Sequence, residues 1–158
     1  MPRSAFDIRV RAEAKLAPLS AAFVQKTASK ILKSLGWKKA ALSILLVGDA
    51  KIRAYNRRYL RHNRTTDVLA FGQFRKAAPR QFSKGLSAAP PFLGDLMICV
   101  PMARRQAKVY GNRFRYELCF YLCHGILHLM GYDDRGARQA RRMERKQKAL
   151  LAAVGVRN

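Results

Sequence analysis

ALSILLVGD, residues 41–49, is the stretch that indicates the fold most directly. Six of its first seven residues are apolar, and Gly48 and Asp49 end the apolar run. A short apolar run bounded by turn residues is typical of a buried strand. Asp49 is a favourable residue for capping a helix, and residues 50–61 follow it. We therefore expect a strand that leads directly into a helix, which is the repeating unit of α/β domains.

The segments on either side continue this alternation. We expect further strands at residues 6–10, 65–71 and 91–100, and further helices at residues 18–36, 101–110, 113–130 and 136–153. Strands and helices interleave early and helices dominate late. This order predicts an α/β (α+β) fold for residues 1–158, a single compact domain with a small mixed sheet of about four strands and about five helices. Residues 72–91 are basic and rich in Gly, Pro, Ser and Ala, which predicts a mobile loop within the domain.

The net charge of the chain indicates the class of its partner. Lys and Arg number 32 against 9 Asp and Glu, so the formal charge is +23 and the isoelectric point is near 11.1. Such an imbalance costs self-repulsion, and a polyanionic partner relieves it. The basic residues are spread along the whole chain rather than gathered in one amphipathic helix, which favours nucleic acid over a membrane surface.

Cysteine usage and the N-terminus indicate the compartment. Cys99, Cys119 and Cys123 all lie within apolar stretches, and an odd, sparse count argues against disulfides. The N-terminal residues lack the apolar core of a secretory signal, and no apolar run approaches the roughly 18 residues that a membrane span requires. We therefore expect a cytoplasmic protein without disulfides.

HGILHLMGYDD, residues 124–134, carries the clearest chemical pattern. His124 and His128 are four residues apart, so on a helix their rings project from one face and can reach one zinc ion. Gly131 permits a sharp exit from the helix, after which Asp134 can return as a third ligand. Aspartate is an acceptable zinc ligand through one oxygen. An isolated pair of histidines at this spacing also occurs by chance.

The residue after the first histidine limits the chemistry. Zinc proteases with paired helical histidines have a glutamate there as general base, whereas this chain has Gly125, so the protease interpretation fails. A zinc ion can still lower the pKa of a bound water. Cys119 and Cys123 lie about 100–180° around the helix from the histidines, so we expect them to be core residues.

Residues 124–134 resemble the signature HGxLHLxGYDH of the YbeY family of bacterial endoribonucleases. Other segments agree with this family in order and spacing across nearly the whole chain. They are Asn56 with Tyr59, the run Thr66-Asp67-Val68-Leu69-Ala70-Phe71, the strand Leu93-Gly94-Asp95-Leu96 with Ile98, and Met143 in the last helix.

The resemblance implies a compact α/β fold with one zinc ion at the floor of a cleft, formed by a helix in the C-terminal half and the loop after it. In this sequence the matching ligands are His124, His128 and Asp134. The family cleaves single-stranded RNA, processes the 3′ end of small-subunit ribosomal RNA and takes part in ribosome quality control. The small ribosomal subunit is thus an expected partner, and the basic composition fits an RNA substrate.

Three positions depart from the family pattern. Asp134 stands where the family has its third histidine, which lowers the charge of the site by one unit and makes a bound water harder to deprotonate. Leu60 replaces the arginine that follows the tyrosine, so Arg61 is the candidate phosphate contact, with Arg57 and Arg58 a turn earlier. Thr65 replaces a proline. The alternative to an enzyme is a ribosome-assembly factor that binds RNA and whose metal is structural.

Other candidates surround this site. Asp95, Asp133 and Glu117 are the carboxylates expected near the metal ligands, where a hydrogen bond to a histidine would orient it. For Asp95 a role at a strand end, and for Glu117 an ion pair with Arg113, are the structural alternatives. The basic residues of the loop are expected to contact RNA, namely Arg75, Lys76, Arg80 and Lys84.

Overall fold

Four strands form one mixed sheet in the order β1-β2-β4-β3. A computed structural model describes residues 4–60, 67–72 and 89–158 of the chain. The strands are β1 (Phe6–Ala12), β2 (Ala40–Val47), β3 (Val68–Gly72) and β4 (Phe92–Cys99). β1, β2 and β4 run parallel, and β3 pairs antiparallel with β4.

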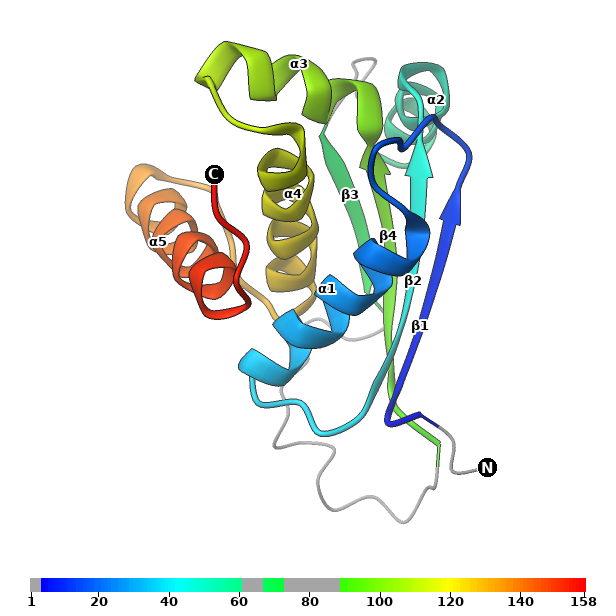
Figure 1. The fold of residues 1–158 in the computed structure, drawn as a ribbon, viewed down its shortest axis with the longest axis vertical. Helices are drawn as coiled ribbons and strands as arrows, with labels where there is room; N and C mark the ends of the chain where they lie inside the picture. Colours follow the sequence, from blue (N-terminus) through cyan, green and yellow to red (C-terminus); the bar gives the residue numbers. More distant parts are fainter. Residues whose placement is uncertain (1–3, 61–66, 73–88) are drawn as a thin grey trace.

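The described residues form five helices around this sheet (Figure 1). They are α1 (Ala21–Ser34), α2 (Asp49–Leu60), α3 (Val100–Tyr110), α4 (Phe114–Leu129) and α5 (Ala137–Ala153). α3 lies across one end of the sheet. α1 and α4 lie on one face, and α5 packs on the outer side of α4. α2 lies on the other face, where Ile52 packs with Met97 and Cys99. The predicted α/β (α+β) fold, a single compact domain, is confirmed.

The element boundaries differ from the sequence predictions by a few residues. α1 begins at Ala21 instead of residue 18, because the Ser20 side chain accepts a hydrogen bond from the backbone N–H of Phe23 (3.1 Å) and caps the helix there. Asp49 lies inside the first turn of α2 rather than before it. Its carboxylate accepts two hydrogen bonds from the Arg105 guanidinium of α3, at 2.6 and 3.0 Å.

α4 is the central element of the fold and is buried on most of its surface. It lies between the sheet and α5, so apolar residues occupy nearly every side of it, including Leu118, Leu122 and Ile126. It packs closely against the sheet at Gly125. A Cβ atom there would lie 2.9 Å from Leu96 Cδ2 and 3.1 Å from Val68 Cγ2. This close contact fixes the depth of the histidines on either side of Gly125.

The three cysteines are free and buried, which confirms the predicted absence of disulfides. Cys119 and Cys123 of α4 belong to the hydrophobic core. Burial raises the pKa of each of these two thiols to about 12, so neither is a thiolate at neutral pH. Their prediction as core residues is confirmed. In the part of the chain that the structure describes, no helix combines the length and apolar character of a membrane span.

Candidate metal centre

His124 and His128 project from the same side of α4, one turn apart. Their Nε2 atoms are 2.9 Å apart, and their rings meet edge to face with centroids 4.5 Å apart. Two imidazoles on one helix at this spacing aim their nitrogens at a common point.

The turn after α4 brings Asp134 back to the two histidines. The helix ends at Leu129, and Gly131 then adopts a φ of 89°, a conformation that favours glycine. The backbone N–H of Tyr132 donates to the carbonyl of Leu127 (3.0 Å) and closes the turn. The Asp134 Oδ2 atom consequently lies 3.5 Å from Nε2 of His124 and 3.8 Å from Nε2 of His128.

The neighbouring carboxylate, Asp133, is hydrogen-bonded to Arg135 and not to the histidines. It accepts hydrogen bonds from the backbone N–H (3.0 Å) and the side-chain Nε (2.8 Å) of Arg135. These contacts hold the pKa of Asp133 at about 2. Asp133 therefore stabilises the turn that presents Asp134.

The geometry of this cluster fits a tetrahedral metal ion. Ligand atoms about 2.0–2.1 Å from a tetrahedral ion lie about 3.3–3.4 Å from one another, close to the spacing among His124, His128 and Asp134. Two imidazoles and one carboxylate are a donor set that catalytic zinc sites use. The side chains are 19%, 29% and 46% exposed in that order, so the cluster opens to solvent on one side. Among the described residues this is the one group of three or more His, Cys, Asp or Glu with such geometry.

The surroundings of His124 favour the form that binds metal. Burial lowers its pKa, and the electrostatic effect of the neighbouring His128 lowers it further. The imidazole is therefore neutral at physiological pH, as a metal ligand must be. Its Nδ1 atom lies 3.0 Å from the side-chain amide of Gln147 on α5, which fixes the plane of the ring.

Gln147 is a residue of this site to which sequence analysis gave no role. It is 2% exposed and follows Met143 by four residues on the buried face of α5. A polar residue at a core position of an amphipathic helix was the available clue, because a buried amide requires a hydrogen-bond partner.

A cleft of about 570 Å³ opens beside the cluster, between α4 and α5. His124 and Asp134 lie in its wall together with Asp67, Gln147 and the stacked rings of Tyr116 and Phe120, whose centroids are 6.2 Å apart. Glu117 also lines the cleft and is buried. It accepts a hydrogen bond from Asn112 Nδ2 (2.9 Å), and the described contacts link it to neither histidine.

Asp95 does not belong to this cluster, which corrects the sequence prediction. Along β4, Leu96 faces α4, whereas Asp95 and Met97 face the opposite side of the sheet. There Asp95 lines a separate groove of about 630 Å³ with Tyr55, Tyr59 and Phe71. The alternation of side chains along a strand places it out of reach of His124.

Two of the predicted phosphate contacts, Arg57 and Arg58, lie outside the cleft between α4 and α5. Arg57 and Arg58 are exposed on the last turn of α2, and the Arg58 guanidinium lies 5.5 Å from the ring centroid of Tyr59. Neither is among the residues that line the cleft. The remaining predicted RNA contacts lie outside the described residues, namely Arg61, Arg75, Lys76, Arg80 and Lys84, as does most of the predicted loop 72–91.

Gly125 explains why no carboxylate follows the first histidine. Its position faces Leu96 and Val68 in the core, so a glutamate there would point into the sheet instead of the cleft. A general base of the zinc-protease kind has no room at this position. The arrangement could hold a cation with one side open to solvent.

Comparison with known proteins agrees with this geometry. Residues 9–155 match the model of a protein family described as endoribonuclease YbeY. The endoribonuclease YbeY of Geobacter metallireducens is 39% identical over 139 residues, covering 87% of this chain and 88% of the relative. That of Moorella thermoacetica is 43% identical over 119 residues, covering 75% and 76%. A solution structure of a Thermotoga maritima protein is 26% identical, with a TM-score of 0.63 over 93% of this chain and 88% of that one.

Proposed function

Because the chain belongs to the YbeY family of endoribonucleases, we propose that its cleft cuts single-stranded RNA with the help of one metal ion, zinc. The observation that carries this proposal is the cluster of His124, His128 and Asp134 at the wall of an open cleft. The ring pair Tyr116 and Phe120 in the same cleft supports a substrate with unpaired bases, since aromatic side chains stack on exposed bases.

Each group of residues has a separate role in the proposed cleavage. His124, His128 and Asp134 hold the ion, which when bound supplies a Lewis acid beside the scissile phosphodiester. Gln147 holds the plane of the His124 ring. Tyr116 and Phe120 stack bases and orient the strand, and Arg61 steadies the charge that develops on the phosphate. The loop cations Arg75, Lys76, Arg80 and Lys84, with Arg57 and Arg58, contact the backbone.

The biological context belongs to the same proposal. We infer that the substrate is the 3′ end of small-subunit ribosomal RNA, that the small subunit is the partner, and that the protein acts in the cytoplasm in ribosome quality control. The support is the resemblance to the family and the +23 charge of the chain, which suits a highly anionic assembly.

A turnover assay tests the proposal. Purified protein is incubated with a labelled single-stranded RNA in excess over enzyme, before and after treatment with a chelator, and then with zinc restored. We expect multiple turnovers that stop with the chelator and return with zinc, and no cutting of the same sequence as a duplex. Binding without turnover under every metal condition would replace the enzyme with an RNA-binding assembly factor.

A further inference from the structure

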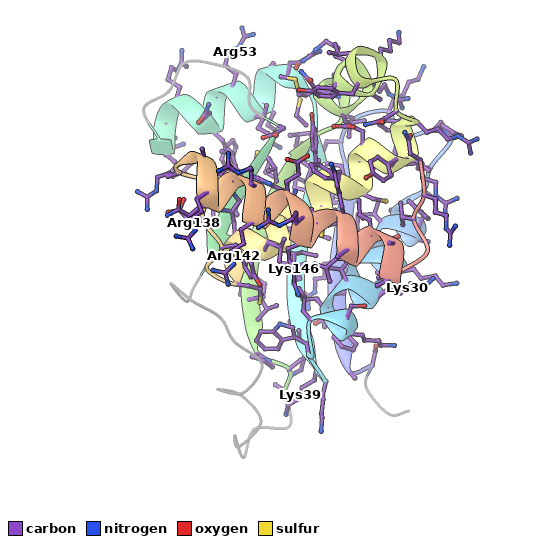
Figure 2. All side chains as sticks on the ribbon, turned by 90° about the vertical axis from the view of Figure 1, so that its left-hand side faces the viewer. Lys30, Lys39, Arg53, Arg138, Arg142 and Lys146 are labelled. Atoms are coloured by element: carbon purple, nitrogen blue, oxygen red, sulfur yellow. The ribbon has the colours of Figure 1, made fainter. Side chains whose placement is uncertain are left out.

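The outer face of α5 carries a row of cations. Arg138, Arg142 and Lys146 follow one another at intervals of four residues, and Figure 2 shows them along the helix with Lys30 of α1 on the same side of the molecule. At a rise of 1.5 Å per residue, this α5 row spans about 12 Å with about 6 Å between neighbours. Arg138 and Arg142 are exposed, and Lys146 is half-buried.

Little negative charge offsets these cations. α1 and α5 pack together and contain nine Lys and Arg, three on α1 and six on α5, against a single acid, Glu144. Glu144 is already paired with Lys148 (2.9 Å). The first turn of α5 has no acidic residue to complement the helix dipole, and Arg138 opposes that dipole. Like charges four residues apart also destabilise a helix. An anionic partner relieves each of these costs.

The α5 row points away from the cleft. Ala140, Glu144 and Gln147 of α5 line the cleft, and at about 100° per residue Arg142 lies about 160° around the helix from Glu144. An RNA strand whose scissile bond lies at His124 and Asp134 would have to pass around α5 before it could contact the α5 row. The α5 row would therefore contact a different part of a large RNA from the part in the cleft, or a second RNA molecule.

The chemistry of the α5 row fits phosphates and not bases. α5 contains no aromatic side chain, and the one ring beside the α5 row, Tyr132, is half-buried with its centroid 5.7 Å from the Arg142 guanidinium, so among the described residues this face offers no open platform on which unpaired bases could stack. A duplex hides its bases and presents a higher density of phosphate than a single strand. The cleft has the opposite character, with Tyr116 and Phe120 in its wall.

We propose that Arg138, Arg142 and Lys146 form a docking surface for the phosphate backbone of an RNA helix, separate from the cleft that receives the single strand. This inference rests on the proposed function for its choice of RNA as the polyanion. The protein then holds a structured RNA at two places, and the helix bound on α5 presents its single-stranded extension to the metal centre.

The test compares two triple variants of equal charge. Arg138→Gln/Arg142→Gln/Lys146→Gln removes the α5 row. Arg9→Gln/Arg11→Gln/Lys51→Gln is the control, because Arg9 pairs with Asp7 and both Arg11 and Lys51 pair with Glu13, so two carboxylates already offset most of its positive charge. Each variant lowers the formal charge from +23 to +20. Affinity is measured by anisotropy, with a chelator present to prevent cutting, for a hairpin with a single-stranded 3′ extension and for the extension alone.

We expect the α5 variant to bind the hairpin about tenfold more weakly near physiological salt, and its plot of log affinity against log salt to lose about 2–3 units of slope. The control should change little, and with the extension alone the two variants should behave alike. Equal losses for both variants on the hairpin would overturn the inference, since net charge alone would then explain them. The choice of RNA would be overturned if wild-type protein bound anionic phospholipid vesicles as tightly as the hairpin and the α5 variant lost this binding. Cleavage is assayed separately, so an inactive protein with these binding results would contradict the proposed function alone.

Discussion

Two carboxylates in this molecule sit in contrasting regions. Asp49, where α2 meets α3, accepts two hydrogen bonds from one guanidinium at 2.6 and 3.0 Å. Asp134, in the turn after α4, faces two imidazoles at 3.5 and 3.8 Å, beyond the distance of a good hydrogen bond. The hydrogen bonds of the Asp49 carboxylate are satisfied by the protein itself. The Asp134 carboxylate instead lies at the distance from the two imidazoles that ligands of one shared cation have.

This difference indicates which carboxylate is free for function. A residue paired with an arginine contributes to stability, and its loss should leave the cleft intact. A residue held near other ligands by a turn that Asp133 and Arg135 fix should contribute mainly to binding. Four test substitutions, each with a control or companion variant, examine this contrast and the support of His124 behind it.

The largest effect is expected for Asp134→Ala. Removing one of three ligands should abolish stoichiometric zinc binding and reduce cleavage by about 10³-fold or more, because an open site with two protein ligands holds zinc poorly. Metal content is measured by mass spectrometry and cleavage by gel assay. Asp134→His should keep the metal.

Asp133→Ala is the matched control for Asp134. It should retain bound zinc, with its effect confined to the order of the turn. Full metal occupancy and unchanged cleavage in Asp134→Ala would remove Asp134 from the ligand set.

Gly125→Ala tests the close packing behind the histidines. The new Cβ would meet Leu96 and Val68 at 2.9 and 3.1 Å, so α4 must move from the sheet and the free energy of unfolding should fall by about 1–3 kcal/mol. Gly48→Ala is the control, because no atom lies within 4 Å of its Cβ position. Urea unfolding measures both. Equal stability of the two variants would show that the contact at Gly125 yields easily.

Gln147→Leu tests the second contact of His124. An apolar side chain of similar size leaves Nδ1 without its partner, so zinc affinity should fall by about 10–100-fold. Gln147→Glu retains an acceptor for the Nδ1 proton of a metal-bound imidazole and should lose less. Competition with a chromogenic chelator gives both affinities. Unchanged affinity in Gln147→Leu would mean that packing alone orients the ring.

Among the four test substitutions, Asp49→Asn should have the smallest effect, and it should depend on pH. Arg105 lowers the pKa of Asp49, so the pair stabilises the fold above the usual carboxyl pKa of 3.8 and loses this contribution as the pH falls through the lower, folded value. The variant should lose about 0.5–1 kcal/mol at pH 6, allowing for solvent screening of a half-exposed pair, and progressively less as the pH falls below 3.8. Unfolding in the presence of a chelator measures this difference. Asp7→Asn, in the more exposed pair with Arg9, should show a smaller change.

Much of the fold was predictable because each element has its own local pattern. The apolar run 41–47 specified a buried strand, and the spacing of His124 and His128 specified the helix face they share. The family resemblance was likewise predictable, because its motifs are local and collinear. Element order also suggested an α/β fold, but the antiparallel position of β3 beside β4 depends on long-range pairing that periodicity does not contain.

The positions of Asp95 and Gln147 could not be predicted from local sequence patterns. β4 is apolar on both faces, because α4 covers one and α2 covers part of the other, so alternation alone does not say which face meets the histidines. Gln147 reaches His124 across 23 positions of sequence, through the packing of α5 on α4. Both assignments required the tertiary arrangement.

All three candidate ligands lie within eleven consecutive residues, 124–134, and this has a consequence for how zinc and folding are linked. Closing so short a segment around an ion costs little chain entropy, so the unfolded polypeptide also has appreciable affinity for zinc. The ion stabilises the native state only by the difference between its two affinities. Saturating zinc should therefore protect this protein from denaturation less than the tightness of the native site alone implies, and a nascent chain can acquire its metal before α5 has docked.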